Sequence, residues 1–194
     1  YEGTRNADSA DWADMEKCMS MVRRLHQSGI TVAHSFDIRE RISFYEKLCR
    51  SHGALLFEDY EEVKGWMDWL DSMERPKCLC HIDANVDNFL FFEDGSVKLL
   101  DWEYAGMCDP VMDVSMCAIY SYYKEEDMER LFRLYLRREP SEDELFALYA
   151  NAALGGFLWC LWAVYKSILG DEFGEYTIIM YRYAKKYYRK LRKL

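Results

Sequence analysis

The stretch H-I-D-A-N-V-D-N at residues 81–88 decides how the rest of this 194-residue chain is interpreted. It is followed by an apolar run at 89–92, by the turn-forming residues 93–96, by a second apolar run and then by Asp101. Apolar runs separated by Asp, Gly and Ser predict two strands joined as a hairpin. Because the chain goes out and returns between Asn88 and Asp101, the sequence predicts that these two residues lie at the same end of the hairpin.

The spacing within this stretch is a pattern that phosphoryl transfer uses. Asp83 is followed five positions later by Asn88, on a loop between two strands. In that arrangement the Asp orients the attacking hydroxyl and the Asn amide oxygen binds Mg²⁺. Asp101 offers a second hard oxygen ligand of the kind that Mg²⁺ prefers. Such polar residues can also simply cap turns, but the three together favour a catalytic site.

Most of the chain outside the hairpin is predicted to be helical. Apolar residues recur there at a spacing of three to four, and Ser141 is placed to cap the start of one helix. The helices are expected over residues 8–27, 37–50, 58–73, 111–123, 125–138, 141–169 and 172–192. The fold class is therefore α+β and mainly α, with one β insertion at residues 78–101.

The charge of the chain excludes some classes of partner. The sequence holds 25 Lys and Arg against 34 Asp and Glu, for a net charge of −9. Such a surface repels phosphate, so we expect neither a nucleic-acid partner nor an anionic membrane. The basic residues gather at 184–194, where they suit the negative end of a helix dipole. A cationic ligand fits the remaining, more acidic part.

The cysteines and apolar runs indicate a cytoplasmic protein. The 7 Cys form no C-x-x-C pair, and no secretory signal is recognisable. Cys78 and Cys80 would share one face of a strand, but two thiolates without a second pair do not make a tetrahedral zinc site. The longest apolar candidate for a membrane span, residues 152–169, is interrupted by two glycines and Lys166, so we expect no membrane partner.

The motif around Asp83 resembles that of a known group of enzymes. The run H-x-D-x-x-x-x-N at 81–88 with D-W-E-Y-A-G at 101–106 resembles the catalytic segment of choline/ethanolamine kinases and aminoglycoside phosphotransferases, whose fold is similar to that of protein kinases. The D-P-x-x-D element of that group is matched at 109–113. The resemblance implies ATP and Mg²⁺ as cofactors. It implies Asp83 and His81 in the catalytic segment, with Asn88 and Asp101 as metal ligands; such a His braces the loop more often than it moves a proton.

Two further segments resemble the choline kinase branch of this group. They are W-C-L-W at 159–162 and E-F-G-E-Y at 172–176, and the branch implies choline as the acceptor, with ethanolamine left open. A quaternary ammonium is held by ring faces and diffuse negative charge. Rings at helical spacing are also ordinary core residues. The candidate substrate-binding residues are Glu103, Tyr120, Trp159, Trp162, Phe173 and Tyr176.

A complete kinase of this group also needs a lobe that covers the nucleotide. The sequence contains no G-x-G-x-x-G loop, and residues 1–5 look like the hinge that would follow such a lobe. We therefore expect residues 1–194 to be a single domain, the C-terminal catalytic and acceptor-binding lobe. Its partner would be the N-terminal lobe of a longer chain, and alone it should be inactive or weakly active.

Two other functions stay open at this point. One is phosphate transfer to an aminoglycoside or to another amino-alcohol or amino-sugar. The other is a non-catalytic module that binds a small cation and keeps vestigial kinase residues; the joint presence of Asp83, Asn88 and Asp101 counts against it. The pair Trp159 and Trp162 favours a trimethylammonium group, because polyamine sugars are gripped mainly by carboxylates.

Overall fold

The computed structural model of the chain describes residues 3–54, 56–73 and 75–193. By packing, the chain divides into two compact units. The first comprises Tyr1–Phe36 and Arg75–Leu148, and the second comprises Asp37–Glu74 and Tyr149–Leu194. The helix α6 (Glu142–Ile168) begins in the first unit and continues in the second.

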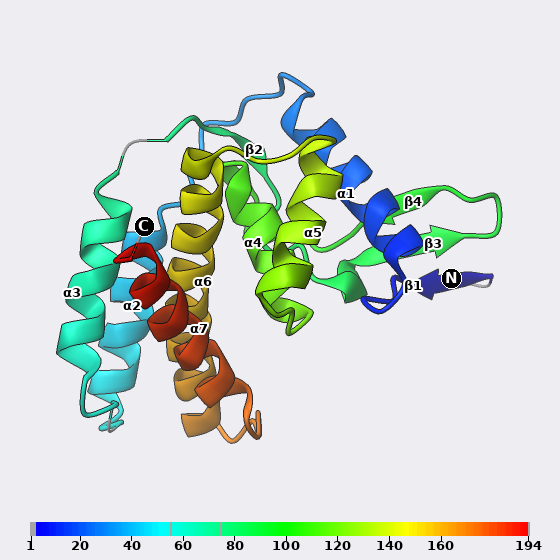
Figure 1. Ribbon diagram of the computed structural model, residues 1–194. Helices are drawn as coiled ribbons and strands as arrows, with labels where there is room; N and C mark the ends of the chain where they lie inside the picture. Colours follow the sequence, from blue (N-terminus) through cyan, green and yellow to red (C-terminus); the bar gives the residue numbers. More distant parts are fainter. Residues whose placement is uncertain (1–2, 55, 74, 194) are drawn as a thin grey trace. The chain divides into compact units, whose positions relative to one another are not determined.

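The first unit contains the helices α1 (Trp12–His26), α4 (Val111–Tyr120) and α5 (Glu125–Leu136), which contact one another (Figure 1). Met15, Cys18, Met19 and Val22 of α1 are fully buried, as their helical spacing predicts. This helix begins at Trp12 rather than at residue 8, because the Asp11 side chain accepts a hydrogen bond from the Ala13 amide and caps the first turn.

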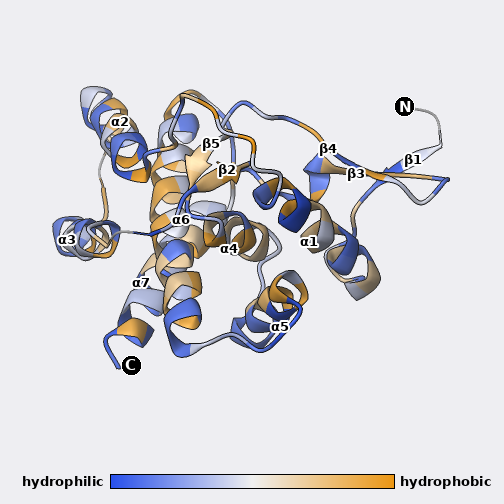
Figure 2. Cartoon of the chain, turned by 90° about the horizontal axis from the view of Figure 1, so that it is seen from above, coloured by the Kyte–Doolittle hydropathy of each residue, from blue (hydrophilic) through white to orange (hydrophobic). Residues whose placement is uncertain are grey.

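Two small antiparallel sheets complete the first unit. One has the strand order β1 (Thr4–Asn6), β3 (Phe89–Phe92), β4 (Val97–Leu99), and the other pairs β2 (Cys78–Cys80) with β5 (Gly106–Cys108). Figure 2 shows β2 and β5 side by side. The predicted hairpin is confirmed as β3 and β4, with Phe89 opposite Leu99.

The strands β1 and β5 were not predicted, and the β structure extends beyond residues 78–101. Thr4 and Arg5, which belong to the segment interpreted as a hinge, pair with β3; the first two residues lie outside the described part. At β5 the backbone of Gly106 lies against that of Phe36, where a Cβ would lie 2.9 Å from the Phe36 amide nitrogen. Three-residue strands give too little periodicity to be recognised in a sequence.

The second unit contains α2 (Ile38–Ser51), α3 (Tyr60–Asp71), the larger part of α6 and α7 (Tyr176–Leu191). Rings join these helices, as between Trp66 and Tyr188, whose centroids are 4.4 Å apart. The backbones of α6 and α7 approach closely at Gly156, where a Cβ would lie 2.7 Å from the Met180 carbonyl oxygen. A glycine is therefore required at this crossing.

Several predicted helix ends are moved by local backbone geometry. The helix α4 ends at Tyr120 rather than at residue 123, because Tyr122 takes a left-handed φ of 54°. The helix α7 starts at Tyr176 rather than at residue 172, after Gly174 with its positive φ of 53°. The helix α3 ends at Asp71 rather than at residue 73.

The predicted cap at Ser141 is confirmed and is reciprocal. The Ser141 Oγ accepts a hydrogen bond from the Glu144 amide at 3.2 Å, and the Glu144 carboxylate accepts one from the Ser141 amide at 2.9 Å. Arg138 also pairs with this carboxylate, and the three contacts lower the pKa of Glu144 to about 2. The start of α6 is thus held by a capping box.

The apolar character of α6 belongs to a core helix. By length and composition alone it could cross a membrane, although the sequence analysis disqualified it for its glycines and Lys166. In the structure, 78% of its most apolar 18-residue stretch is buried inside the protein. Figure 2 shows the predominance of hydrophobic residues along this helix. Burial against protein accounts for this composition.

Candidate active site

The loop between β2 and β3 brings Asp83 and Asn88 together. A short 3-10 turn, Val86–Asn88, folds the end of this loop back toward its start. The Asn88 side-chain amide donates to the Asp83 main-chain oxygen at 2.9 Å and to its carboxylate at 3.0 Å. Because the NH₂ group is used in these contacts, the carbonyl oxygen of the Asn88 side chain is the atom that can accept a cation.

The hairpin returns Asp101 to this loop. The Leu100 amide donates to the main-chain carbonyl oxygen of Asn88 at 2.9 Å, so Asp101 directly follows the residue that pairs with Asn88. Asp101 is exposed and takes a left-handed φ of 59°, a conformation that Asp tolerates better than most residues. The prediction that Asn88 and Asp101 meet at one end of the hairpin is confirmed in this geometry.

The environment of Asp83 shifts the pKa of its carboxyl group. Burial of its carboxyl group raises its pKa above the ordinary value. Hydrogen bonds from Tyr120 and Asn88 oppose this rise, and the nearby charge of Asp101 adds to it. A carboxylate with a raised pKa is a better proton acceptor near neutral pH than an ordinary Asp. Tyr120, expected to line the acceptor pocket, here contacts the Asp83 carboxylate.

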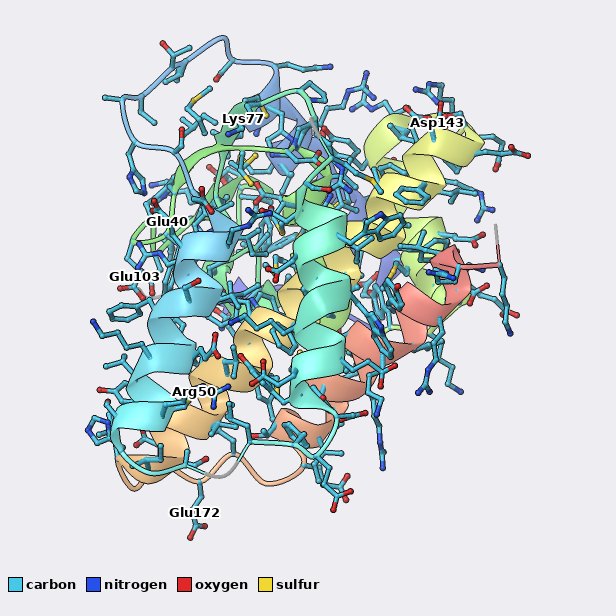
Figure 3. The ribbon with its side chains drawn as sticks, turned by 90° about the vertical axis from the view of Figure 1, so that its left-hand side faces the viewer. Glu40, Arg50, Lys77, Glu103, Asp143 and Glu172 are labelled. Carbon is cyan, nitrogen blue, oxygen red and sulfur yellow. The ribbon has the colours of Figure 1, made fainter. Side chains whose placement is uncertain are left out.

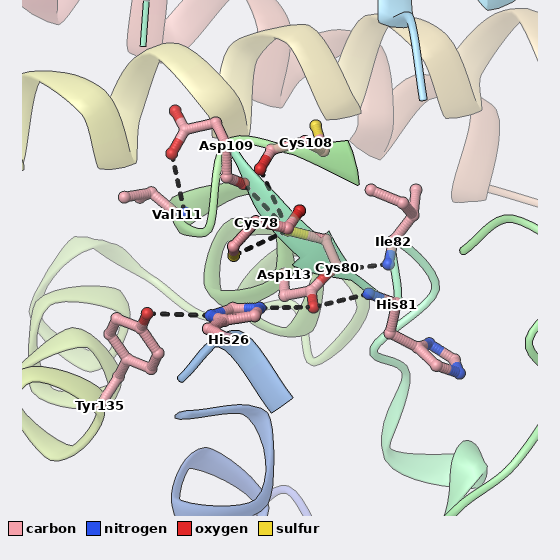
Figure 4. Close-up of polar contacts among 10 residues, drawn as sticks. All are labelled: His26, Cys78, Cys80, His81, Ile82, Cys108, Asp109, Val111, Asp113 and Tyr135. Atoms are coloured by element: carbon pink, nitrogen blue, oxygen red, sulfur yellow. Dashed lines mark hydrogen bonds and ion pairs between the residues drawn. The ribbon is translucent and has the colours of Figure 1, made fainter. Parts of the chain in front are cut away.

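The buried carboxylate of Asp113 fixes the backbone directly before Asp83 (Figure 4). It accepts hydrogen bonds from the amides of His81 at 2.8 Å and of Ile82 at 2.6 Å. Ile82 has a φ of 72°, a left-handed conformation that is strained for a β-branched residue. The two bonds to Asp113 hold this strained residue in place, and so set the direction in which the chain enters the catalytic loop.

His26 is the partner of Asp113 that the sequence analysis missed. Its Nε2 lies 2.9 Å from the Asp113 carboxylate and its Nδ1 lies 2.9 Å from the Tyr135 hydroxyl (Figure 4). Burial lowers the pKa of His26, but the hydrogen bond and charge of Asp113 outweigh it and leave the pKa raised. Nothing in the spacing of the histidines identified this role, because the pairing depends on how α1 packs beside β2.

His81 braces the segment that carries Asp101. Its Nε2 donates to the Leu100 carbonyl oxygen at 2.8 Å, and its ring meets the edge of Trp102 at 4.8 Å between centroids. The Trp102 indole in turn donates to the Leu99 carbonyl oxygen at 3.0 Å. His81 is fully buried, so this geometry matches a bracing residue rather than one that meets a substrate.

Glu103 lies in the turn that follows Asp101. The Ala105 amide donates to the Trp102 carbonyl oxygen at 3.1 Å and closes this turn. The Glu103 side chain is exposed at the surface (Figure 3). It carries a negative charge two residues from Asp101, as the proposed contact with a cation requires.

Four of the candidate rings form a continuous row within the second unit. The centroid of Trp162 lies 5.8 Å from that of Trp159 and 5.0 Å from that of Phe173, and Phe173 lies 6.1 Å from Tyr176. Trp159 is buried, whereas Trp162 and Phe173 are half-buried. The Lys166 ammonium lies 5.8 Å from the Trp162 ring centroid, so a ring of this row already faces a cation.

Comparisons with known proteins identify the family of this chain. The profile of the "Phosphotransferase enzyme family" matches residues 12–149. The "Protein LicA" of Haemophilus influenzae is 24% identical over 185 residues, which cover 84% of this chain and 52% of that protein. The chain thus spans about half the length of this curated relative.

Solved structures show the same fold. The choline kinase LicA from Streptococcus pneumoniae superposes with a TM-score of 0.82 at 26% identity, over 97% of this chain and 68% of that one. A structure of LicA in complex with AMP gives a TM-score of 0.83 at 25% identity, over 98% and 67%. The mainly helical α+β fold class is confirmed, and the chain belongs to the phosphotransferase enzyme family.

Proposed function

We propose that this chain is the C-terminal lobe of a kinase that transfers the γ-phosphate of ATP to the hydroxyl of choline, forming phosphocholine. The observation that carries the proposal is the convergence of Asp83, Asn88 and Asp101 at one end of the β3–β4 hairpin. The similarity to a choline kinase supports the choice of acceptor.

Asp83 is the residue that would handle the proton. It would orient the choline hydroxyl and accept its proton as the oxygen attacks phosphorus, a task that its raised pKa suits. The Asn88 amide holds the Asp83 carboxylate in position from one side. His81 and Asp113 would act as positioning residues, since both are buried. His81 donates to the Leu100 carbonyl oxygen, and Asp113 accepts from the amides of His81 and Ile82.

The donor set at the hairpin end fits Mg²⁺. Asn88 offers a side-chain carbonyl oxygen and Asp101 an exposed carboxylate, both hard oxygen donors. These two residues would hold the ion, which when bound neutralises charge on the transferred phosphate. The complex of the similar LicA structure with AMP supports nucleotide binding by the complete protein.

The row of rings is the proposed grip on the acceptor. A trimethylammonium group donates no hydrogen bond, so its recognition rests on ring faces and on negative charge. Trp162 and Phe173, which are half-buried, would present ring faces, with Trp159 and Tyr176 beside them. Glu103 would add negative charge, and Tyr120 would line the acceptor pocket beside the Asp83 carboxylate that it contacts.

We further propose that the nucleotide-covering lobe is the N-terminal part of a longer cytoplasmic chain. The matched LicA protein is about twice as long as the region that this chain matches. On this proposal residues 1–194 alone would transfer phosphate weakly or not at all. Robust turnover by the 194-residue chain would contradict it.

The test is phosphate transfer by the longer chain to choline, ethanolamine and kanamycin, measured in parallel with ATP. The Asp83→Asn variant serves as the blank. A preference for choline that the blank loses would support the proposal. A preference for kanamycin would show that the acceptor is an amino-sugar rather than choline. No activity on any of the three would contradict the assignment of an amino-alcohol acceptor.

A further inference from the structure

The side chains of His26, Cys78 and Cys80 gather in the first unit, outside the catalytic loop. One ligand atom from each lies within 4.8 Å of the others. Cys78 and Cys80 lie on the same face of β2, and their Sγ atoms are 3.7 Å apart (Figure 4). The sequence predicted no zinc site at these cysteines because it showed no second pair of thiolates, whereas the structure supplies a third ligand, His26, from α1.

The separation of the two sulfur atoms suits a tetrahedral ion. With Zn–S bonds of about 2.3 Å, a tetrahedral site places two sulfur ligands about 3.8 Å apart. The observed 3.7 Å therefore needs no rearrangement of the strand. A tetrahedral site places sulfur and imidazole nitrogen about 3.6 Å apart. A ring nitrogen of His26 lies within 4.8 Å of both sulfur atoms, so the ring would move by little more than about 1 Å. A disulfide would need a sulfur separation of about 2 Å.

The hydrogen bonds of His26 are those of a metal-ligating imidazole. When the ring is neutral and its Nε2–H donates to the Asp113 carboxylate, the lone pair of Nδ1 faces the Tyr135 hydroxyl. An ion bound at Nδ1 replaces only that hydroxyl and leaves the contact with Asp113 intact. A carboxylate that accepts from the far nitrogen is the usual outer partner of a histidine ligand.

We propose that Cys78, Cys80 and Nδ1 of His26 form a site for a thiophilic divalent cation such as Zn²⁺. Sulfur and imidazole ligands exclude Mg²⁺ from this site. Binding replaces the thiol protons, which pass to solvent, and a water molecule takes the fourth position, since Cys78 is only half-buried. The ion would tie α1 to β2 directly beside Asp113, and so stabilise the network that holds the catalytic loop.

The experiment is a Co²⁺ titration of the reduced, chelator-treated protein in excess Mg²⁺, which occupies oxygen sites. The expected result is one equivalent of Co²⁺ with a sulfur-to-cobalt charge-transfer band, its displacement by Zn²⁺, and a higher unfolding midpoint with the ion bound. Cys78→Ser should remove the band, and this variant should fold because the side chain is half-buried. Cys49→Ser, a buried cysteine of the second unit, is the matched control and should keep the band.

Two further variants test the ligand set. Tyr135→Phe removes the hydroxyl that competes for Nδ1, so it should tighten Co²⁺ binding several-fold; weaker binding would overturn the assignment of Nδ1. Asp113→Asn should weaken binding by about 10- to 100-fold, as the loss of an outer partner does. The proposal is overturned if the band is absent, if it survives in Cys78→Ser, or if the two thiols form a disulfide and retain no metal.

Discussion

The two regions proposed to act together in this protein are held in different ways. The catalytic segment, residues 81–101 of the first unit, is fixed by hydrogen bonds that its amides donate to Asp113 and by one that the His81 ring donates to its backbone. The aromatic row, Trp159 to Tyr176 of the second unit, is joined by ring contacts. Removing a buried carboxylate that accepts several hydrogen bonds breaks all of those bonds at once. Removing one ring of the row breaks only the contacts of that ring. The two regions should therefore respond differently to single substitutions.

Asp113→Ala should have the largest effect on stability. It leaves the buried amides of His81 and Ile82 without an acceptor and removes the partner of His26. Each buried donor left unpaired costs about 1–3 kcal/mol, so unfolding in urea should show a loss of about 3–5 kcal/mol.

Asp143→Ala is the matched control, because Asp143 also lies in the first turn of a helix but is exposed (Figure 3). It should change stability by only a few tenths of a kcal/mol. Equal losses in the two variants would mean that the Asp113 network contributes no more than an ordinary helix charge.

Trp162→Ala tests the aromatic row by a graded effect. A cation–π contact contributes about 0.5–2 kcal/mol, so KM for choline should rise about 2- to 30-fold in the complete kinase while kcat changes little. Trp162 is a sharper choice than Trp159, whose side chain is only 4% exposed and whose loss would destabilise the core. Trp69→Ala, an exposed tryptophan of the same unit, should leave KM unchanged. A lower kcat with unchanged KM would show that Trp162 does not hold the acceptor.

Ser141→Ala removes the cap of the helix that passes through both units. The expected loss is about 1 kcal/mol in urea unfolding at pH 7. Because the folded-state pKa of Glu144 is about 2, the stability contributed by its contacts is present above its ordinary pKa of 4.5 and is lost as the pH falls toward 2. Glu144→Gln should flatten this part of the pH dependence, and Glu142→Gln, an exposed neighbour, should not.

Tyr120→Phe should have the smallest effect, on the pH profile rather than on the maximal rate. The Tyr120 hydrogen bond opposes the rise in the pKa of Asp83, so its loss should raise that pKa further. The acid limb of kcat/KM should then move to higher pH. Tyr122→Phe, which alters an exposed neighbour, should leave the limb in place. A shift to lower pH would contradict the assignment of Asp83 as the base.

The sequence was sufficient to predict those parts of the structure that a local pattern of residues determines. The hairpin, the order of the helices and the cap at Ser141 each depend on residues close together in the chain, and each is confirmed. The strands β1 and β5 were missed because each is three residues long and is defined by a distant partner.

The support of the catalytic loop could not be predicted in the same way. Asp113 was recognised only as part of a D-P-x-x-D element, and His26 was assigned no role. Their hydrogen bonds join α1, β2 and α4, three elements that are distant in sequence. They also stabilise a strained backbone conformation at Ile82 that cannot be predicted from an isoleucine in the sequence. The roles of Asp83, Asn88, Asp101 and the aromatic row stay predictions.

The most direct test of the central claim is the separate measurement of kcat and KM for Asp83→Asn in the complete kinase, with choline and ATP. If Asp83 accepts the hydroxyl proton, kcat should fall by about 10²- to 10⁴-fold while KM for choline changes little. A kcat within a few-fold of the unsubstituted enzyme, or a change confined to KM, would contradict the assignment of Asp83 as the catalytic base.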